Sequence, residues 1–232
     1  MWLRNKSLQK LGGGFGERFA IGVLSQLHLF LLGSHKEKEV VKLIRRVRRE
    51  RKCLLTAFEC FSVYSLVRAQ SDLPGELAEV GVFAGASAKL ICEARGQAPL
   101  HLFDTFEGLP DSSDKDSDVY RKKPQLFACS LEAVRAYLGD YPDVNFYKGF
   151  FPDTAGPVSD KTFSFAHFDV DLYESTLACL EFFYPRMSPG GVMLSHDYSI
   201  LAGVKEAFDE FFADKPERIV ELITTQCMVF KQ

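Results

Sequence analysis

Short apolar runs alternate with helix-length segments from residue 77 to the end of the chain, and this alternation restricts the fold more than any other feature. Strands that alternate with helices of this length form βαβ units, because parallel neighbours need a crossover connection. The sequence therefore predicts an α/β fold with a mostly parallel sheet. The closing strands, 219–222 and 226–230, predict an antiparallel hairpin at one edge. The other strands are expected at 77–82, 100–103, 144–147, 163–168 and 192–195, and helices at 87–95, 130–138, 175–184 and 203–212.

The part of the chain before residue 73 lacks this alternation. Residues 1–72 are expected to be helical and end at a Pro-Gly pair, so we divide the chain into an N-terminal helical extension (1–72) and an α/β domain (73–232). With 47% hydrophobic and 25% charged residues, the chain can bury a sizeable core. Its six cysteines show neither CxxC pairing nor metal-ligand spacing, which indicates reduced side chains in a cytoplasmic protein.

Charge is divided unevenly along the chain. Residues 1–52 contain 13 Lys and Arg against 4 Asp and Glu, whereas the remainder contains 15 against 27. The overall net charge of −3 argues against nucleic acid as the main partner. A basic arm on an acidic body is either a solvated helix face or a surface that meets anionic lipid, nucleic acid or an acidic neighbouring subunit. The sequence leaves these alternatives open.

The stretch from Phe19 to Leu32 is apolar but is not expected to span a membrane. It is interrupted by polar residues and falls short of the ~20 residues that a span needs. It also lacks the small-residue cleavage site of a secretory signal. We expect a helix that lies against the domain, with peripheral contact to a membrane surface as the alternative.

Polar residues stand at the carboxyl ends of four predicted strands. They are the segment 79–85, Asp104, Asp169 and the pair His196 and Asp197. In an open α/β sheet, these ends line the crevice where ligands bind. A single Asp after a strand is often a turn or cap residue, but four such positions at one sheet edge predict a binding site.

The turn after the first predicted strand, EVGVFAGAS at 79–87, indicates a ligand without phosphate. Gly81 and Gly85 permit a tight turn and close approach of a ligand, but their spacing does not match G-x-G-x-x-G, and no P-loop Lys follows. S-adenosylmethionine presents an ammonium, a carboxylate and a ribose instead. Glu79 suits the ammonium, Ser87 suits the carboxylate, and Asp104 suits the ribose hydroxyls.

The acids after two later strands indicate a metal site. Asp169 and Asp197 end separate strands and can face one crevice, where two carboxylates and a third ligand bind a hard cation. Asp169 could also receive the proton of a substrate hydroxyl polarised by that cation. His196 has three interpretations: a metal ligand that shifts the preference from magnesium toward manganese, iron or zinc, a general base, or a pocket histidine beside Asp197. Asp171 is expected on the opposite strand face, as a structural or helix-cap residue.

The strings DTFEGLP (104–110), DVDLYEST (169–176), PGG (189–191) and HDY (196–198) resemble the macrocin O-methyltransferase (TylF/MycF-like) family. The turn at 79–87 resembles the first motif of the catechol and caffeoyl-CoA type O-methyltransferases. Together the resemblance covers roughly residues 55–212. It implies a Rossmann-like class I methyltransferase fold, commonly in a dimer, that methylates sugar or aromatic hydroxyls with magnesium.

The resemblance also implies roles for individual residues. The cofactor would lie at Glu79, Gly81, Phe83, Gly85, Ser87 and Asp104, with an adenine contact near Gly149 and Phe150. The metal would lie at Asp169, His196 and Asp197, with Asp169 as the base. This chain has His196 followed by Asp197 where the family commonly has two consecutive acids. The choice between Mg²⁺ and Mn²⁺ therefore stays open.

These observations together predict a metal-assisted, S-adenosylmethionine-dependent O-methyltransferase that acts on a hydroxyl of a sugar or phenolic small molecule. Acceptor contacts are expected in the acidic loop 107–123, whose Asp residues are interpreted as a solvated lid. One alternative is a non-catalytic scaffold that has kept the methyltransferase fold and engages a partner through its basic arm. The other is a nicotinamide-dependent oxidoreductase, which the missing third glycine and the absence of a Tyr-x-x-x-Lys pair disfavour.

Overall fold

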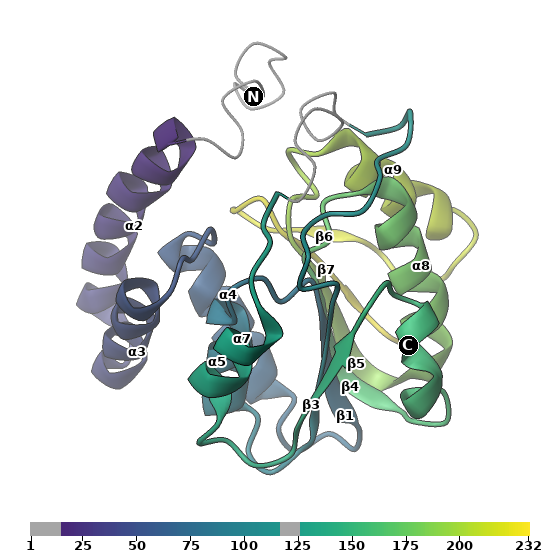
Figure 1. The fold of residues 1–232 in the computed structure, drawn as a ribbon, viewed down its shortest axis with the longest axis horizontal. Coiled ribbons are helices and arrows are strands. Elements are labelled where there is room, and N and C mark those ends of the chain that lie inside the picture. Colours follow the sequence, from purple (N-terminus) through teal and green to yellow (C-terminus); the bar gives the residue numbers. More distant parts are fainter. Residues whose placement is uncertain (1–14, 117–125) are drawn as a thin grey trace.

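The computed structural model of the chain describes residues 15–116 and 126–232, and one seven-stranded sheet forms its centre (Figure 1). The strand order is β3-β2-β1-β4-β5-β7-β6. Strands β1 to β5 run parallel, and β7 pairs antiparallel with both β5 and β6. The predicted α/β fold with an antiparallel C-terminal edge hairpin is confirmed. The strands are β1 (Glu76–Val80), β2 (Leu100–Asp104), β3 (Val144–Lys148), β4 (Phe163–Phe168), β5 (Met187–Ser195), β6 (Val220–Glu221) and β7 (Cys227–Phe230).

The connections make the carboxyl ends of β1 and β4 the switch point of the sheet. From β1 the chain proceeds to β2 and β3 on one side, and it then returns to β4 and β5 on the other side. Loops that leave β1 and β4 therefore diverge and open a crevice between them. The candidate residues of the sequence lie around this crevice.

Helices cover both faces of the sheet (Figure 1). One face is covered by α4 (Ala57–Ala69), α5 (Ala86–Ala94) and α7 (Leu131–Leu138), and the other by α8 (Tyr173–Phe183) and α9 (Ala202–Phe211). All six residues of the central strand β4 are buried, because both of its faces pack against helices. Its apolar residues divide accordingly, with Phe165 in one core and Phe168 in the other.

One segment with the composition of a turn lies inside a strand. The segment 188–191 belongs to β5, whose pairing with β4 shifts register between Phe163 and Phe165. Gly190, at φ 84°, donates its N–H to the Lys231 carbonyl, and the Lys231 N–H donates to Gly191. These backbone hydrogen bonds to Lys231 thus continue the strand pairing through a segment whose composition favours a turn.

Three described helices precede the sheet, in agreement with the helical prediction for this part of the chain. They are α2 (Phe15–His35), α3 (Lys38–Glu50) and α4, and α2 lies on the outer side of α4. Helix α4 begins at a capping box, in which the Glu59 N–H donates to the Thr56 hydroxyl and the Thr56 N–H donates to Glu59 Oε2. The division of the chain at residue 72 stays a prediction.

Among the helices that the structure describes, none combines the length and the apolar character needed to cross a membrane. Two shorter 3-10 segments, η1 (Asp153–Val158) and η2 (Tyr184–Arg186), complete the described helices. All six cysteines lie in the described parts of the chain and are free.

Candidate functional site

The glycine turn that follows β1 is shaped by the protein itself. Gly81 has φ 87°, and a Cβ at this position would overlap the backbone carbonyl of Asp169, which follows β4. Gly85 caps the start of α5 and has a left-handed conformation, at φ 79°. A Cβ added at Gly85 would lie 3.1 Å from the side chain of Val134 in α7. Only glycine accepts these two conformations and contacts without strain. The sequence predicted that a ligand approaches the backbone closely at this turn. At Gly81 the group that approaches is instead the backbone of Asp169, just after β4.

Asp104, at the end of β2, holds the glycine turn in place. Its Oδ2 accepts the N–H groups of Val82 (2.7 Å) and Phe83 (2.9 Å), and its Oδ1 accepts the N–H of Phe106 (2.6 Å). Each carboxylate oxygen has two acceptor positions, so these bonds fill Oδ2 and leave one position on Oδ1 for one of the ribose hydroxyls that the sequence predicted. Asp104 therefore connects the two loops next to the predicted cofactor position.

Glu79 is fully buried and has one unused oxygen. Its Oε1 lies 2.9 Å from Nδ1 of His167 on β4, while its Oε2 has no hydrogen-bond partner among the described residues. Burial raises the pKa of Glu79, although hydrogen bonds from His167 and Ser87 act in the opposite direction. A buried carboxylate oxygen without a partner fits the ammonium that the sequence placed here. No sequence pattern indicated His167, because a histidine inside a buried strand belongs to no motif.

The remaining predicted cofactor residues lie along the same edge of the sheet. Phe83 is half-buried, with its ring edge-on to Phe127 at 5.7 Å between centroids. The N–H of Gly149 donates to the Asp104 carbonyl at 3.0 Å, which joins the ends of β2 and β3. Phe150, next along the chain, is 41% exposed. An exposed aromatic ring at this edge fits the flat adenine group that the resemblance assigned to it.

Asp169, His196 and Asp197 come together beyond the ends of β4 and β5. Nδ1 of His196 lies 3.1 Å from Asp169 Oδ1 and 3.1 Å from Asp197 Oδ2. Backbone hydrogen bonds extend the sheet pairing to these residues. The N–H of Asp169 donates to the Val80 carbonyl, and the N–H of His196 donates to the Phe168 carbonyl. One donor atom from each of the three side chains lies within 4.8 Å of the others. Two carboxylate oxygens and an imidazole nitrogen fit a divalent cation that accepts mixed ligands.

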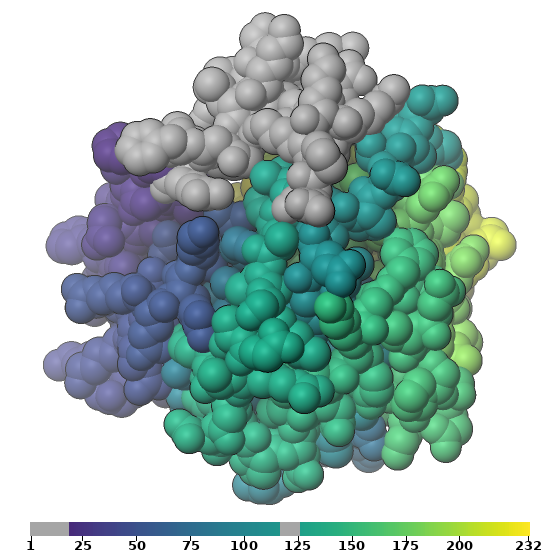
Figure 2. Space-filling model, in the orientation of Figure 1, coloured from purple at the N-terminus to yellow at the C-terminus, as the bar shows by residue number. Residues whose placement is uncertain are grey.

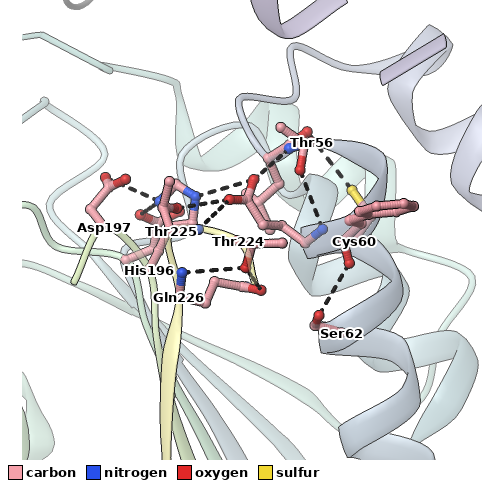
Figure 3. Close-up of polar contacts among 12 residues, drawn as sticks. Thr56, Cys60, Ser62, His196, Asp197, Thr224, Thr225 and Gln226 are labelled. Carbon is pink, nitrogen blue, oxygen red and sulfur yellow. Dashed lines mark hydrogen bonds and ion pairs between the residues drawn. The ribbon is translucent and has the colours of Figure 1, made fainter. Parts of the chain in front are cut away.

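Glu59 of α4 approaches His196 from the side opposite to the two Asp residues. Its Oε2 lies 3.6 Å from Nε2 of His196, and its Oε1 accepts both the hydroxyl (2.7 Å) and the N–H (3.3 Å) of Thr225. Figure 3 shows His196 between Asp197 and the first turn of α4, where Thr56 lies. Glu59 was not among the residues predicted for the site. Its capping box with Thr56 is readable from the sequence, but its contact with a residue more than a hundred positions away is not.

Burial and charge act in opposite directions on the protonation of His196. Burial alone lowers its pKa, but the carboxylates of Asp197, Asp169 and Glu59 outweigh this effect and raise the pKa well above its usual value. For Asp169, burial raises the pKa, but His196 more than compensates and the pKa is lowered. A histidine that retains its proton is a poor general base. Because the pKa of His196 is raised, a metal and a proton would compete for its Nδ1 nitrogen.

The expectation that Asp171 faces away from the site is wrong. β4 ends at Phe168, so the alternation of a strand does not extend to Asp171, whose φ is 61°. Burial, the charges of Asp197 and Asp169, and a hydrogen bond shared with Asp197 raise its pKa well above the usual value. Asp171 is not the cap of α8 either, since that position is Leu172. The site thus has a third aspartate.

The acidic loop is only partly solvated. Asp116 is buried and accepts the N–H and hydroxyl of Ser113, both at 2.8 Å, and the N–H of Tyr173 at 2.8 Å. These bonds attach the loop to the start of α8, whereas Asp111 and Asp114 are exposed, as expected for a lid. Residues 117–123 of this predicted acceptor loop lie outside the described residues.

Comparisons with known proteins agree with the resemblance. Residues 62–232 match the family described as Macrocin-O-methyltransferase (TylF). The demethyldecarbamoylnovobiocin O-methyltransferase of Streptomyces niveus is 33% identical over 172 residues, which cover 66% of this chain and 64% of that protein. The 8-demethyl-8-(2,3-dimethoxy-alpha-L-rhamnosyl)-tetracenomycin-C 4'-O-methyltransferase of Streptomyces olivaceus is 34% identical over 143 residues, which cover 55% of this chain and 54% of that protein. The chain thus spans less than two thirds of these relatives.

The fold agrees with these matches. The solved structure of the O-methyltransferase NovP has a TM-score of 0.69 with this chain, at 26% identity, and the match covers 78% of this chain and 82% of that one. The family match covers most of the chain, including the turn at 79–87 and the three aspartates of the site. The chain therefore belongs to the macrocin O-methyltransferase (TylF) family.

Proposed function

We propose that this chain transfers the methyl group of S-adenosylmethionine to a hydroxyl of a sugar or phenolic small molecule, with the help of a divalent metal. The observation that carries this proposal is the meeting of two sets of residues at one crevice. Glu79, Ser87 and Asp104 stand on the β1 and β2 side, and the acids around His196 stand on the β4 and β5 side. Such an arrangement allows a methyl donor and a hydroxyl acceptor to lie next to each other.

S-adenosylmethionine would be held by Glu79, Ser87 and Asp104, with the turn at 81–85 around it and Phe150 on its adenine side. The unpartnered Oε2 of Glu79 supports this assignment, because a buried carboxylate oxygen needs a donor. Asp104 contributes by fixing the N–H groups of Val82 and Phe83, so the turn is already ordered before a ligand arrives.

A divalent metal would be held by Asp169, His196 and Asp197, where it would lower the pKa of the acceptor hydroxyl and orient its oxygen. Asp169 would also receive the hydroxyl proton, because its lowered pKa keeps it ionised. The raised pKa of Asp171 means that this carboxyl retains its own proton, as His196 does, so neither of these two groups is assigned as the proton acceptor.

The relatives support the acceptor class. The relative from Streptomyces olivaceus is named for a rhamnosyl-bearing substrate. A sugar hydroxyl is less acidic than a phenol, so its methylation depends more strongly on a metal and a base. A metal held beside the ionised Asp169 would suit that more demanding acceptor.

Two measurements test the proposal. Calorimetry with S-adenosylhomocysteine should show binding, and mass spectrometry should show methylation of rhamnosyl or phenolic acceptors that is abolished by EDTA. Asp169→Asn should abolish turnover and leave S-adenosylhomocysteine binding intact, whereas Asp111→Asn, at an exposed position, should change neither. Absence of S-adenosylhomocysteine binding by the unmodified chain contradicts the proposal and favours the scaffold alternative. Full activity in EDTA removes the metal from it.

A further inference from the structure

Helix α2 presents an apolar face to solvent, which is unusual for a monomeric protein. Its inner side is covered, because Leu29 and Leu32 are buried in the core that α2 shares with α3 and α4. Its outer side carries six large apolar side chains that are exposed: Phe19 (64% exposed), Val23, Leu24, Leu27 (54%), Phe30 (75%) and Leu31.

The spacing of these residues makes one continuous stripe. Phe19, Val23, Leu27 and Phe30 recur at intervals of three or four residues, which places them on one side of a helix. The segment 19–32 contains no Asp, Glu, Lys or Arg. A solvent-facing helix normally carries charges on its outer side, so this stripe resembles a contact surface rather than a solvated one.

The neighbouring helix α3 supplies positive charge next to the stripe. Five basic residues of α3 are exposed: Lys38, Lys42, Arg45, Arg46 and Arg49. Lys42 pairs with Glu39 and Arg46 with Glu93, while the other three have no ion pair within the described parts of the chain. Figure 2 shows α2 and α3 together forming one flank of the molecule, coloured purple to blue.

Charge complementarity favours an anionic lipid surface as the partner of the α2–α3 flank. An anionic lipid surface attracts Lys and Arg, and it accepts Phe and Leu side chains at the boundary between headgroups and acyl chains. A second copy of the chain fits less well. Contact through α2 would bring together two arms that each contain 13 Lys and Arg against 4 Asp and Glu in residues 1–52. The rest of the chain, with 15 against 27, would be repelled by the same lipid surface and so face away.

We propose that the α2–α3 flank docks this protein on an anionic membrane surface. The apolar stripe of α2 enters the interface, and the basic face of α3 lies on the headgroups. No described helix is long and apolar enough to cross a membrane, so the attachment is peripheral and reversible. This inference does not depend on the proposed methyl transfer.

Sedimentation with lipid vesicles tests the proposal. The full chain should sediment with equimolar phosphatidylcholine and phosphatidylglycerol, and not with phosphatidylcholine alone. Replacing the most exposed stripe residues (Phe19→Gln, Leu27→Gln and Phe30→Gln together) should weaken binding by about tenfold or more. The pair Arg45→Glu and Arg49→Glu should weaken it by a similar factor. Ile223→Gln, at a 95% exposed position in the β6–β7 turn, is the matched control and should bind as the unmodified chain does.

The other outcomes overturn the proposal. Absence of sedimentation with anionic vesicles at low ionic strength contradicts it. Light scattering that shows a dimer dissociated by the stripe substitutions, without vesicle binding, assigns the stripe to a second copy instead. Equal binding to neutral and anionic vesicles removes the role of α3. Circular dichroism should show the same helix content in every variant, because the replaced side chains are exposed.

Discussion

At the residue scale, His196 is the centre of the site's electrostatics. Carboxylates from three separate parts of the chain, Glu59, Asp169 and Asp197, lie within 3.6 Å of its ring nitrogens. A buried imidazole alone would lose its proton, but three nearby negative charges more than compensate. The raised pKa stabilises the fold below the pKa that histidine has in the unfolded chain. This stabilisation is lost as pH rises through the folded pKa.

His196→Asn should therefore destabilise the metal-free protein in a pH-dependent way. The difference in free energy of unfolding from the unmodified chain should be largest near pH 6, where the histidine is charged in the folded state. It should decrease above neutral pH by at most ~1.4 kcal/mol per pH unit. Urea unfolding at a series of pH values in EDTA measures this. A difference that does not change with pH contradicts the assignment.

Asp104→Asn should weaken the binding of S-adenosylhomocysteine. The amide keeps one acceptor oxygen, but it loses the charge that receives the N–H groups of Val82, Phe83 and Phe106. Losing hydrogen bonds to a charged group costs about 1.5–3 kcal/mol each, so the dissociation constant should rise about tenfold to a hundredfold. Calorimetry measures the change, with Asp111→Asn as the exposed control in the following loop. Unchanged affinity for S-adenosylhomocysteine would mean that the hydrogen bonds to Asp104 are not needed to order the glycine turn.

The sequence predicted most of the candidate site at this scale, and its failures share one cause. Asp104, Asp169 and Asp197 were recognised because they follow strands, and a strand's end is readable from local composition. Glu59 and His167 were missed, and Asp171 was placed on the wrong side. Each of these depends on the course of the backbone in three dimensions rather than on a local pattern.

At the element scale, helix α4 connects the N-terminal region to the site. Its first turn carries Glu59, which caps the helix and also binds Thr225 of the β6–β7 hairpin. One side chain thus joins three elements: α4, the hairpin and the end of β5. The N-terminal helices are for this reason linked to the polar centre as well as to the apolar core.

Glu59→Ala should destabilise the fold far more than the loss of a helix cap. The substitution removes the cap and leaves His196 and the Thr225 N–H and hydroxyl without their partner. Breaking a buried charged pair costs about 3–5 kcal/mol. Ser130→Ala is the matched control, since Ser130 only caps α7 in an exposed position and should cost about 1 kcal/mol. Guanidinium unfolding compares the two, and equal costs would contradict a role beyond capping.

The glycine turn gives a second prediction at this scale. Gly81→Ala should disrupt the contact between β1 and β4, because the added Cβ overlaps the Asp169 carbonyl and φ is positive. Gly96→Ala is the control, with φ 65° and open space around the added Cβ, and it should cost only about 1 kcal/mol of backbone strain. Thermal unfolding should show a much larger loss for Gly81→Ala. A comparable loss for both would mean that strand β4 moves aside easily.

At the scale of the whole molecule, the N-terminal helices are part of the core. Helices α2 and α3 share one cluster of buried residues with α4, α5 and the sheet strands. The described helices α2 and α3 are therefore attached to the rest of the molecule by apolar packing, while five basic residues of α3 remain exposed. The dimer that the resemblance implies stays a prediction.

Removing residues 1–52 should prevent stable folding. The deletion removes seven buried aliphatic side chains and exposes the core residues that pack against them. Burial of each such side chain contributes about 1.5–3 kcal/mol to the free energy of unfolding. The seven side chains are Leu29, Leu32, Val40, Val41, Leu43, Ile44 and Val47. The fragment 53–232 should show no cooperative thermal transition by circular dichroism. The Phe19→Gln, Leu27→Gln, Phe30→Gln variant should keep its transition, since it changes only exposed side chains. A cooperative transition in the fragment would show the extension to be dispensable.

The sequence by itself determined the class of fold, the edge of the sheet where ligands bind and the family. These depend on hydrophobic periodicity, on residues that end strands and on short contiguous strings, all of which are local along the chain. Only the tertiary structure decided which groups surround His196, what Gly81 accommodates and which face of α2 is left bare. Those depend on contacts between residues distant in sequence, such as Glu59 with His196 and Gly81 with Asp169, whose distances no local pattern contains.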